Sequence, residues 1–194
     1  MAPSTDISDV LLISFEKSKA SKSKMRTLDK GILKCSGGER IEIFKLCDIQ
    51  HKYKDVPCFT EKLYLMLDDI RFVLIVTCEK LEEVRNSSDL GSLFANLCSE
   101  SKENVCETFI DFINFETKCH KCESKIILLS LSKAIQVPEL FGNVHNHIEN
   151  LLTIDKDEKI ITNIDAVQNL VSAVIGCKGE KRLTFPSNYQ NKQL

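Results

Sequence analysis

The chain has 194 residues, of which 43% are hydrophobic and 28% are charged, and its formal net charge is −2. This length suits one domain with ragged ends, and a chain of this size buries enough surface to fold without a metal ion or a disulfide. The small net charge argues against wholesale nucleic-acid binding. The longest apolar run, residues 72–78, has the length of a strand and falls far short of the roughly 20 residues of a membrane span.

The cysteines and the N-terminal residues bear on the cellular compartment. The chain has nine cysteines, an odd number, and residues 1–8 lack the basic and apolar regions of a signal peptide. These features predict free thiols in a reducing compartment, and therefore a cytoplasmic protein. Cys47 and Cys78 adjoin apolar, strand-like runs, so we expect them to be small core residues.

The first half of the chain alternates between strand-like and helix-like segments. Residues 10–15 form an almost continuous apolar run, which is typical of a strand buried on both faces of a sheet. A Ser- and Lys-rich stretch then predicts a loop that enters a helix, which ends at the glycines at positions 37 and 38. Strands at residues 41–46 and 72–77 flank a helix at residues 61–69, for which Thr60 is the expected N-cap.

The second half continues this alternation after a long polar segment. Residues 79–103 are serine-rich and predict a loop with one short helix. The remaining elements are a helix at residues 105–115, strands at 125–130 and 151–154, the latter a short edge strand, and a helix at 164–175. The alternation predicts one α/β domain at residues 9–176, with a parallel sheet and helices on both faces. Residues 1–8 and 177–194 are assigned to terminal tails.

Three of these segments resemble the TIR and SEFIR family of signalling domains. The run from Asp9 to Phe15, DVLLISF, is similar to the first sequence box of TIR domains. The helix at residues 61–69 and the following strand resemble the family's central helix–strand unit. The strand at residues 125–129 and the later Val137-Pro138 resemble its later strand and proline loop. The resemblance spans roughly residues 8–176 and implies a three-layer, flavodoxin-like sheet with strand order 2-1-3-4-5.

Departures from the TIR pattern favour SEFIR or a divergent TIR domain. The insert at residues 79–104 is similar to the SEFIR branch, whereas TIR domains have a shorter connection there. The chain has no Trp, so the Phe-Trp box of TIR domains is missing. The second TIR box, an Arg-Asp pair followed by a Pro-Gly loop, is also missing. The resemblance implies a signalling module without a cofactor, which assembles with other TIR or SEFIR domains in innate-immune or inflammatory signalling.

Partner-binding residues are expected in the loop at residues 50–59, where TIR domains place their main partner-binding loop. The candidates are Lys52, Tyr53, Lys54, Val56, Pro57 and Phe59. Aromatic side chains dominate interface hot spots, and charges set encounter rate and specificity. The seven Lys and Arg residues at positions 17–34 form a second candidate surface, for an acidic partner or an anionic lipid. An ordinary solvated surface is the alternative for both segments.

An enzymatic alternative follows from the same resemblance, because some TIR domains cleave NAD with a glutamate on the helix after the central strand. The nearest carboxylates here are Glu107 and Glu103. Glu107 lies two positions before the motif position, which Phe109 occupies, and two positions rotate a side chain by about 200° on a helix. A solvated helix residue is the alternative. A weaker hypothesis is an unrelated flavodoxin-like or receiver-like domain, with Asp9 and Asp48 as part of an acidic cluster.

Two groups of residues are candidates for metal binding. Cys119, His120 and Cys122 form a C-x-x-C motif with two or three of the four ligands that zinc requires. A plain loop and a redox pair are the alternatives. His145 and His147 are a second possible pair of ligands, and exposed loop histidines are the alternative. The chain lacks a Gly-rich phosphate loop, so the sequence predicts neither a resident metal nor a cofactor.

Overall fold

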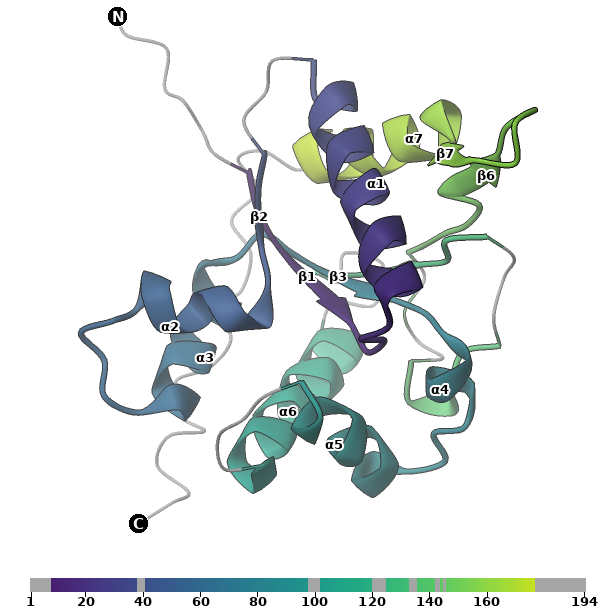
Figure 1. Cartoon of the computed structure of the whole chain (residues 1–194). Helices are drawn as coiled ribbons and strands as arrows, with labels where there is room; N and C mark the ends of the chain where they lie inside the picture. The colour runs from purple at the N-terminus through teal and green to yellow at the C-terminus, as the bar shows by residue number, and fades with distance from the viewer. Residues whose placement is uncertain are drawn as a thin grey trace, which may run out of the picture.

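The computed structural model describes residues 8–37, 41–97, 102–119, 125–132, 136–141, 144 and 146–176. Its centre is a five-stranded, all-parallel sheet with the strand order β2-β1-β3-β4-β5 (Figure 1). The strands are β1 (Ser8–Ser14), β2 (Ile41–Phe44), β3 (Phe72–Val76), β4 (Ile126–Leu129) and β5 (His147–Ile148). Helices surround the sheet, and this arrangement confirms the predicted flavodoxin-like α/β fold.

The three central strands are continuous apolar runs because both of their faces are covered. Every residue of β3 and β4 is buried, and so are the described side chains of β1 from Val10 to Ile13. Leu12 of β1 pairs with Leu74 of β3, which in turn pairs with Ile127 of β4. Uniform apolar sequence, rather than alternation, is the pattern of a parallel sheet between two helical layers.

One face of the sheet packs against two helices. These are α1 (Lys19–Cys35) and α7 (Ile164–Gly176), which lie beside each other in Figure 1. Their buried apolar side chains join Val10, Leu12 and Leu74 in a single core cluster. A separate antiparallel hairpin of β6 (Leu152–Ile154) and β7 (Ile160–Thr162) packs against α1.

The other face packs against a second group of helices. The larger ones are α3 (Phe59–Asp69), α5 (Ser87–Ala95) and α6 (Lys102–Cys119). Four short elements also contribute residues to this side: η1 (Leu46–Asp48), α2 (Ile49–Lys52), α4 (Glu79–Glu82) and η2 (Glu139–Phe141). Phe94 of α5 stacks on Phe109 of α6 at 4.2 Å between ring centroids and meets the edge of Phe15 at 5.1 Å. This aromatic cluster fixes the insert after β3 against the end of β1.

A buried lysine joins α3, α6 and β4 at the opposite end of the sheet. Lys125, which is 5% exposed, directs its Nζ toward the carbonyl oxygens of Leu67 and Asp68, each 3.3 Å away. Its backbone N–H donates to Glu116 Oε2 at 2.6 Å. The ammonium group therefore provides a positive charge at the C-terminus of α3, where the helix dipole favours a cation.

Three helices begin earlier than the sequence predicts, among them α6, which starts at Lys102 rather than at residue 105. The Ser- and Lys-rich stretch before Met25 is part of α1 rather than a loop, because the Ser18 side chain caps the helix by accepting from the Ser21 N–H at 3.0 Å. The N-cap of α3 is Cys58 rather than Thr60, so Phe59 is the first residue of that helix.

The insert and the sheet edge also differ from expectation. Residues 79–97 hold two helices, α4 and α5, instead of one short helix in a long loop. Residues 152–154 do form a strand, but in the β6–β7 hairpin, and the edge of the sheet is β5. Strand β2 ends at Phe44, and residues 46–48 form a 3-10 turn. Among the described residues, no helix combines the length and hydropathy that crossing a membrane requires.

Candidate functional site

The loop that follows β2 is exposed but firmly attached to its surroundings. The Tyr53 hydroxyl donates to Asp69 Oδ2 in α3 at 2.5 Å. The Lys52 Nζ lies 4.2 Å from the centroid of the Phe44 ring in β2 and 5.8 Å from that of Tyr53. A cation over an aromatic face is attracted by the ring quadrupole. These contacts attach the loop to β2 and α3.

The predicted partner-binding residues divide into exposed and packed groups. Lys52, Lys54 and Pro57 are exposed, and Val56 is half-buried. Tyr53 and Phe59 are also half-buried, and both pack against the core cluster that lies beneath α3. The loop therefore presents its lysines and Pro57 outward, whereas the Phe59 ring anchors the start of α3.

A cavity of about 330 Å³ lies at the carboxyl ends of β1 and β2. We call it the cationic cavity, because four basic side chains from three segments line it, together with a single carboxylate. The charged lining residues are Glu16, Lys17, Lys22, Arg26 and Lys45. In open parallel sheets, ligands bind outside the carboxyl ends of the strands, which is where this cavity lies.

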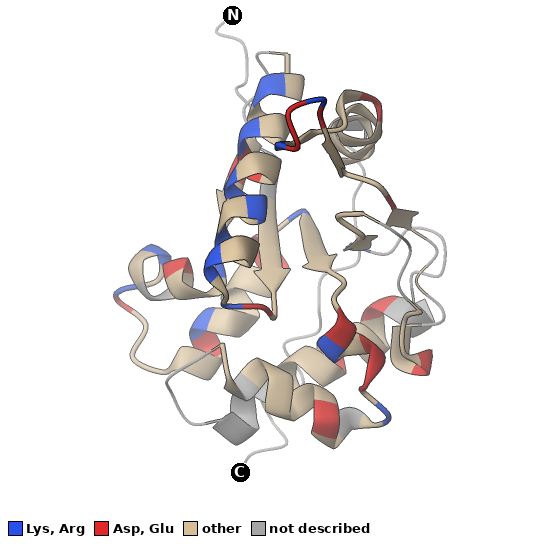
Figure 2. Ribbon diagram, turned by 45° about the vertical axis from the view of Figure 1, so that its right-hand side comes forward, with Lys and Arg blue, Asp and Glu red and all other residues tan. Residues whose placement is uncertain are grey.

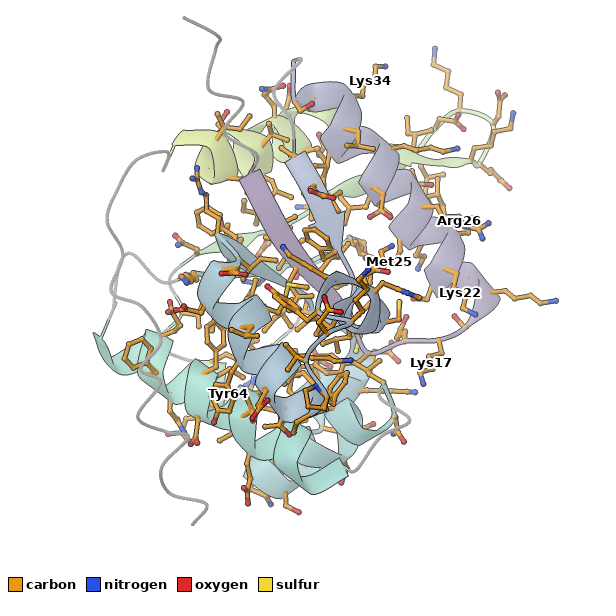
Figure 3. All side chains as sticks on the ribbon, turned by 90° about the vertical axis from the view of Figure 1, so that its left-hand side faces the viewer. Lys17, Lys22, Met25, Arg26, Lys34 and Tyr64 are labelled. Carbon is orange, nitrogen blue, oxygen red and sulfur yellow. The ribbon has the colours of Figure 1, made fainter. Side chains whose placement is uncertain are left out.

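Two of these cations are bound to neighbouring protein groups and two are not. The Lys45 Nζ pairs with Asp29 Oδ2 at 2.7 Å, and the Lys17 Nζ donates to the backbone carbonyl of Asn96 after α5. Lys22 and Arg26 are exposed, and neither side chain forms a hydrogen bond or ion pair with another described residue. Figure 3 shows both on α1, with Met25 between them on the side facing the sheet.

A second cavity of about 230 Å³ lies where β1 and β3 end, and Glu16 lines this cavity as well. Its other lining residues include Thr77, Cys78 and Glu79. Burial raises the pKa of the Cys78 thiol, and the negative charge of Glu16 raises it further. The thiol is therefore held in its neutral form, which is a poor nucleophile.

A chain of polar side chains crosses β3, β4 and β5 beside this cavity. The Thr77 hydroxyl donates to the Leu129 carbonyl at 3.1 Å and lies 2.7 Å from Ser130 Oγ, which is 2.8 Å from His147 Nε2. Each hydroxyl has one proton. Because the Thr77 hydroxyl donates its proton to the Leu129 carbonyl, we infer that Ser130 donates to Thr77. His147 then donates from Nε2 to Ser130. In this order His147 is a donor within the sheet, and its Nδ1 lies 3.8 Å from Glu149 Oε1.

This arrangement corrects the expectation for His147, which is not an exposed loop residue but a half-buried part of β5. His145 lies outside the described residues. Cys78 is buried as expected, but Cys47 is exposed, so its assignment to the core is wrong. Cys35, Cys47, Cys58 and Cys78 are free thiols.

The candidate catalytic and metal-binding residues are only partly described. Glu107 is exposed on α6 and lines neither of the two cavities. The side chains of Glu103 and Cys119 lie outside the described part of the chain, as do His120 and Cys122. Within that part, no three His, Cys, Asp or Glu side chains are grouped so that they could hold a metal ion.

The receiver-like hypothesis requires free carboxylates at the strand ends. Asp48 Oδ2 instead accepts from the Lys45 N–H at 2.7 Å and so stabilises the turn after β2. The side chain of Asp9 lies outside the described residues.

The sequence signals part of the cationic cavity but not the cavity itself. The basic run at residues 17–34 was recognised as a charged surface, and it supplies Lys17, Lys22 and Arg26. Lys45 had no distinguishing signal, because a single lysine after a strand is common. Only the parallel pairing of β1 with β2 brings it beside α1.

Comparison with known proteins finds no family model, no curated protein and no solved structure that matches this chain.

Proposed function

We propose that this chain is a cytoplasmic protein-interaction module of TIR or SEFIR type, which assembles with similar domains in innate-immune or inflammatory signalling. The observation that carries the proposal is the loop at residues 51–58, which runs from the last turn of α2 to the N-cap of α3. It is exposed except at the half-buried Tyr53 and Val56, and it is held by the Tyr53–Asp69 hydrogen bond and by Lys52 over Phe44. A surface that is already ordered loses little conformational entropy when a partner binds.

The charge of this loop indicates what its partner surface should be. His51, Lys52 and Lys54 are exposed on it, against one exposed carboxylate, Asp55. An acidic surface on the partner would complement these charges, steer the encounter and disfavour wrong partners.

A second copy of the chain offers such an acidic surface. Glu79, the first residue of α4, and Glu83, its C-cap, are both exposed, as is Lys80 between them, and Figure 2 shows that acidic residues outnumber basic ones on α4. The loop after β2 and α4 are separate surfaces, so a contact between them would be head-to-tail. Contacts of this kind build open chains or rings of subunits. Homotypic assembly is therefore the form of the proposal that can be tested with this chain alone.

The test is self-association of the purified chain, followed by sedimentation velocity over a concentration series. Lys52→Glu combined with Lys54→Glu should shift the equilibrium toward monomer. Lys156→Glu combined with Lys159→Glu, two exposed residues of the β6–β7 turn, makes the same change in net charge and should leave association unaltered.

Charge reversal on α4 makes this test more specific. Glu79→Lys combined with Glu83→Lys should also weaken self-association, and a mixture of this variant with the loop variant should form mixed oligomers in which the two variants alternate. A wild-type chain that stays monomeric at about 100 µM, above typical micromolar affinities, would exclude homotypic assembly. Equal losses in the loop and turn variants would exclude the loop as the contact.

A further inference from the structure

The first turn of α1 has charges opposite to those that a helix N-terminus favours. The aligned peptide dipoles place partial positive charge there, which acidic side chains normally offset. No acidic residue lies in the first turn of α1, whereas Lys17 precedes it and Lys19 and Lys22 lie within its first four residues. Positive charge has therefore accumulated at a helix end that is already positive, and a bound anion would relieve this repulsion.

Lys17 and Lys22, two of these residues, also line the cationic cavity, so part of the unfavourable charge lies at the wall of a partly open cavity. Lys22 and Arg26 are one helical turn apart on α1, line the cavity and lack a carboxylate partner among the described residues. Lys17 and Lys45, which Asn96 and Asp29 hold in place, form the adjoining walls. A guanidinium group suits phosphate oxygens because it can donate two parallel hydrogen bonds to them.

Most of the remaining lining residues are apolar, and Ser14 is the polar exception. Leu12, Met25, Leu46 and Leu97 contribute to its lining, and of these Leu12, Met25 and Leu46 are buried. A purely ionic site for inorganic phosphate would not require this apolar surface. A ligand with a flat ring would cover the apolar surface and exclude water from it. The volume, about 330 Å³, is near the lower limit of about 300–1,000 Å³ for small-molecule sites.

We propose that the cationic cavity binds a phosphate monoester of a ring-bearing small molecule of mononucleotide size. The phosphate lies between Lys22 and Arg26, and the ring lies against Met25, Leu46 and Leu97. Glu16, the single carboxylate of the lining, accepts a hydrogen bond from a ligand hydroxyl. This site is separate from the loop at residues 51–58, so the proposal does not depend on the proposed function.

The test is isothermal titration of the full chain with three probes: adenosine monophosphate, adenosine and inorganic phosphate. We expect adenosine monophosphate to bind more tightly than either fragment, because only it contacts both halves of the cavity. Lys22→Gln combined with Arg26→Gln should weaken its binding about tenfold or more, since two charge-assisted hydrogen bonds are lost.

The matched control lies on the same helix. Lys30→Gln combined with Lys34→Gln removes the same two charges from exposed positions outside the cavity and should change the affinity less than about twofold. Thermal unfolding of both variants confirms that they are folded. Three results would each overturn the proposal: no binding of adenosine monophosphate at millimolar concentration, equal affinities for it and for inorganic phosphate, or equal losses in the two variants.

Discussion

Gly31 of α1 lies directly against Thr162 of β7, so closely that no larger residue fits between the helix and the hairpin. A Cβ atom on residue 31 would be 2.5 Å from Thr162 Cγ2 and 2.7 Å from its Oγ1. The Thr162 hydroxyl also donates to the Thr27 carbonyl of the same helix at 3.3 Å. A glycine in the middle of a helix is thus explained by the approach of a second element rather than by a turn.

We expect Gly31→Ala to lower the free energy of unfolding by about 1 kcal/mol, because overpacking costs about 1–3 kcal/mol and alanine regains about 1 kcal/mol of helix propensity. In a Thr162→Ala background, where the two closest atoms are gone, the same substitution should instead stabilise the protein. Urea denaturation of the four proteins in this double-mutant cycle measures the change of sign. If the sign of the change were the same in both backgrounds, the two residues would not be coupled.

The hydrogen bond between Tyr53 and Asp69 should protect the loop after β2 from proteolysis. Asp69→Ala removes the acceptor, and a hydrogen bond contributes about 0.5–1.5 kcal/mol. Trypsin cleavage after Lys52 and Lys54 should therefore become about two- to tenfold faster, as measured by mass spectrometry of the fragments. Asp68→Ala removes a neighbouring exposed carboxylate of the same charge and should leave the cleavage rate unchanged.

The Ser130 hydroxyl should stabilise the edge of the sheet at β5. Ser130→Ala leaves His147 without its acceptor at Nε2, at a cost of about 1–3 kcal/mol for an unpaired group. Ser132→Ala, two residues later and exposed, should change stability by less than about 0.5 kcal/mol. In addition, nitrogen NMR should find the neutral His147 ring protonated at Nε2, and a proton on Nδ1 would contradict the order of donors inferred above.

The described cysteines should differ in reactivity. Cys58 is exposed and Cys78 is buried, so iodoacetamide should modify Cys58 first. Cys47 is exposed, but its pKa is raised by burial and by the Asp48 carboxylate, and a raised pKa means that the neutral thiol persists to higher pH. Its alkylation rate should therefore keep rising at pH values above the ordinary thiol range. Peptide mapping at several pH values measures this, and rapid labelling of Cys78 at neutral pH would contradict the assigned burial.

We expect no cleavage of NAD by the purified chain, since Glu107 is exposed and lines neither cavity at the carboxyl edge. The measurement is release of nicotinamide, followed by chromatography over several hours. Turnover that Glu107→Ala abolishes would establish the enzymatic alternative in place of the interaction module.

The sequence predicted best those elements whose burial is uniform. The central strands and α7 were recognised because their apolar residues follow the period of the buried structure. Strand β5 was missed because it has only two residues, one of them a histidine whose place is set by Ser130. The start of α1 was missed because serine and lysine fit a loop as well as a solvent-facing helix, and only the Ser18 cap distinguishes them.

The candidate site was less predictable than the fold, for a related reason. Phe59 looked like an exposed anchor of a loop, but it is the first residue of α3 and packs against the core cluster. The cationic cavity joins residues from β1, α1, the segment after β2 and the segment after α5, which no local pattern connects.

The buried ammonium of Lys125 has a consequence for how the protein opens. The Lys125 ammonium group contacts the last carbonyls of α3, and the Lys125 backbone N–H donates to Glu116 of α6. None of these groups can separate without leaving a charge or a carboxylate unpaired in the interior, which costs more than exposing apolar surface. The end of α3, the second half of α6 and the start of β4 should therefore open as one cooperative unit, and their amides should exchange with solvent together.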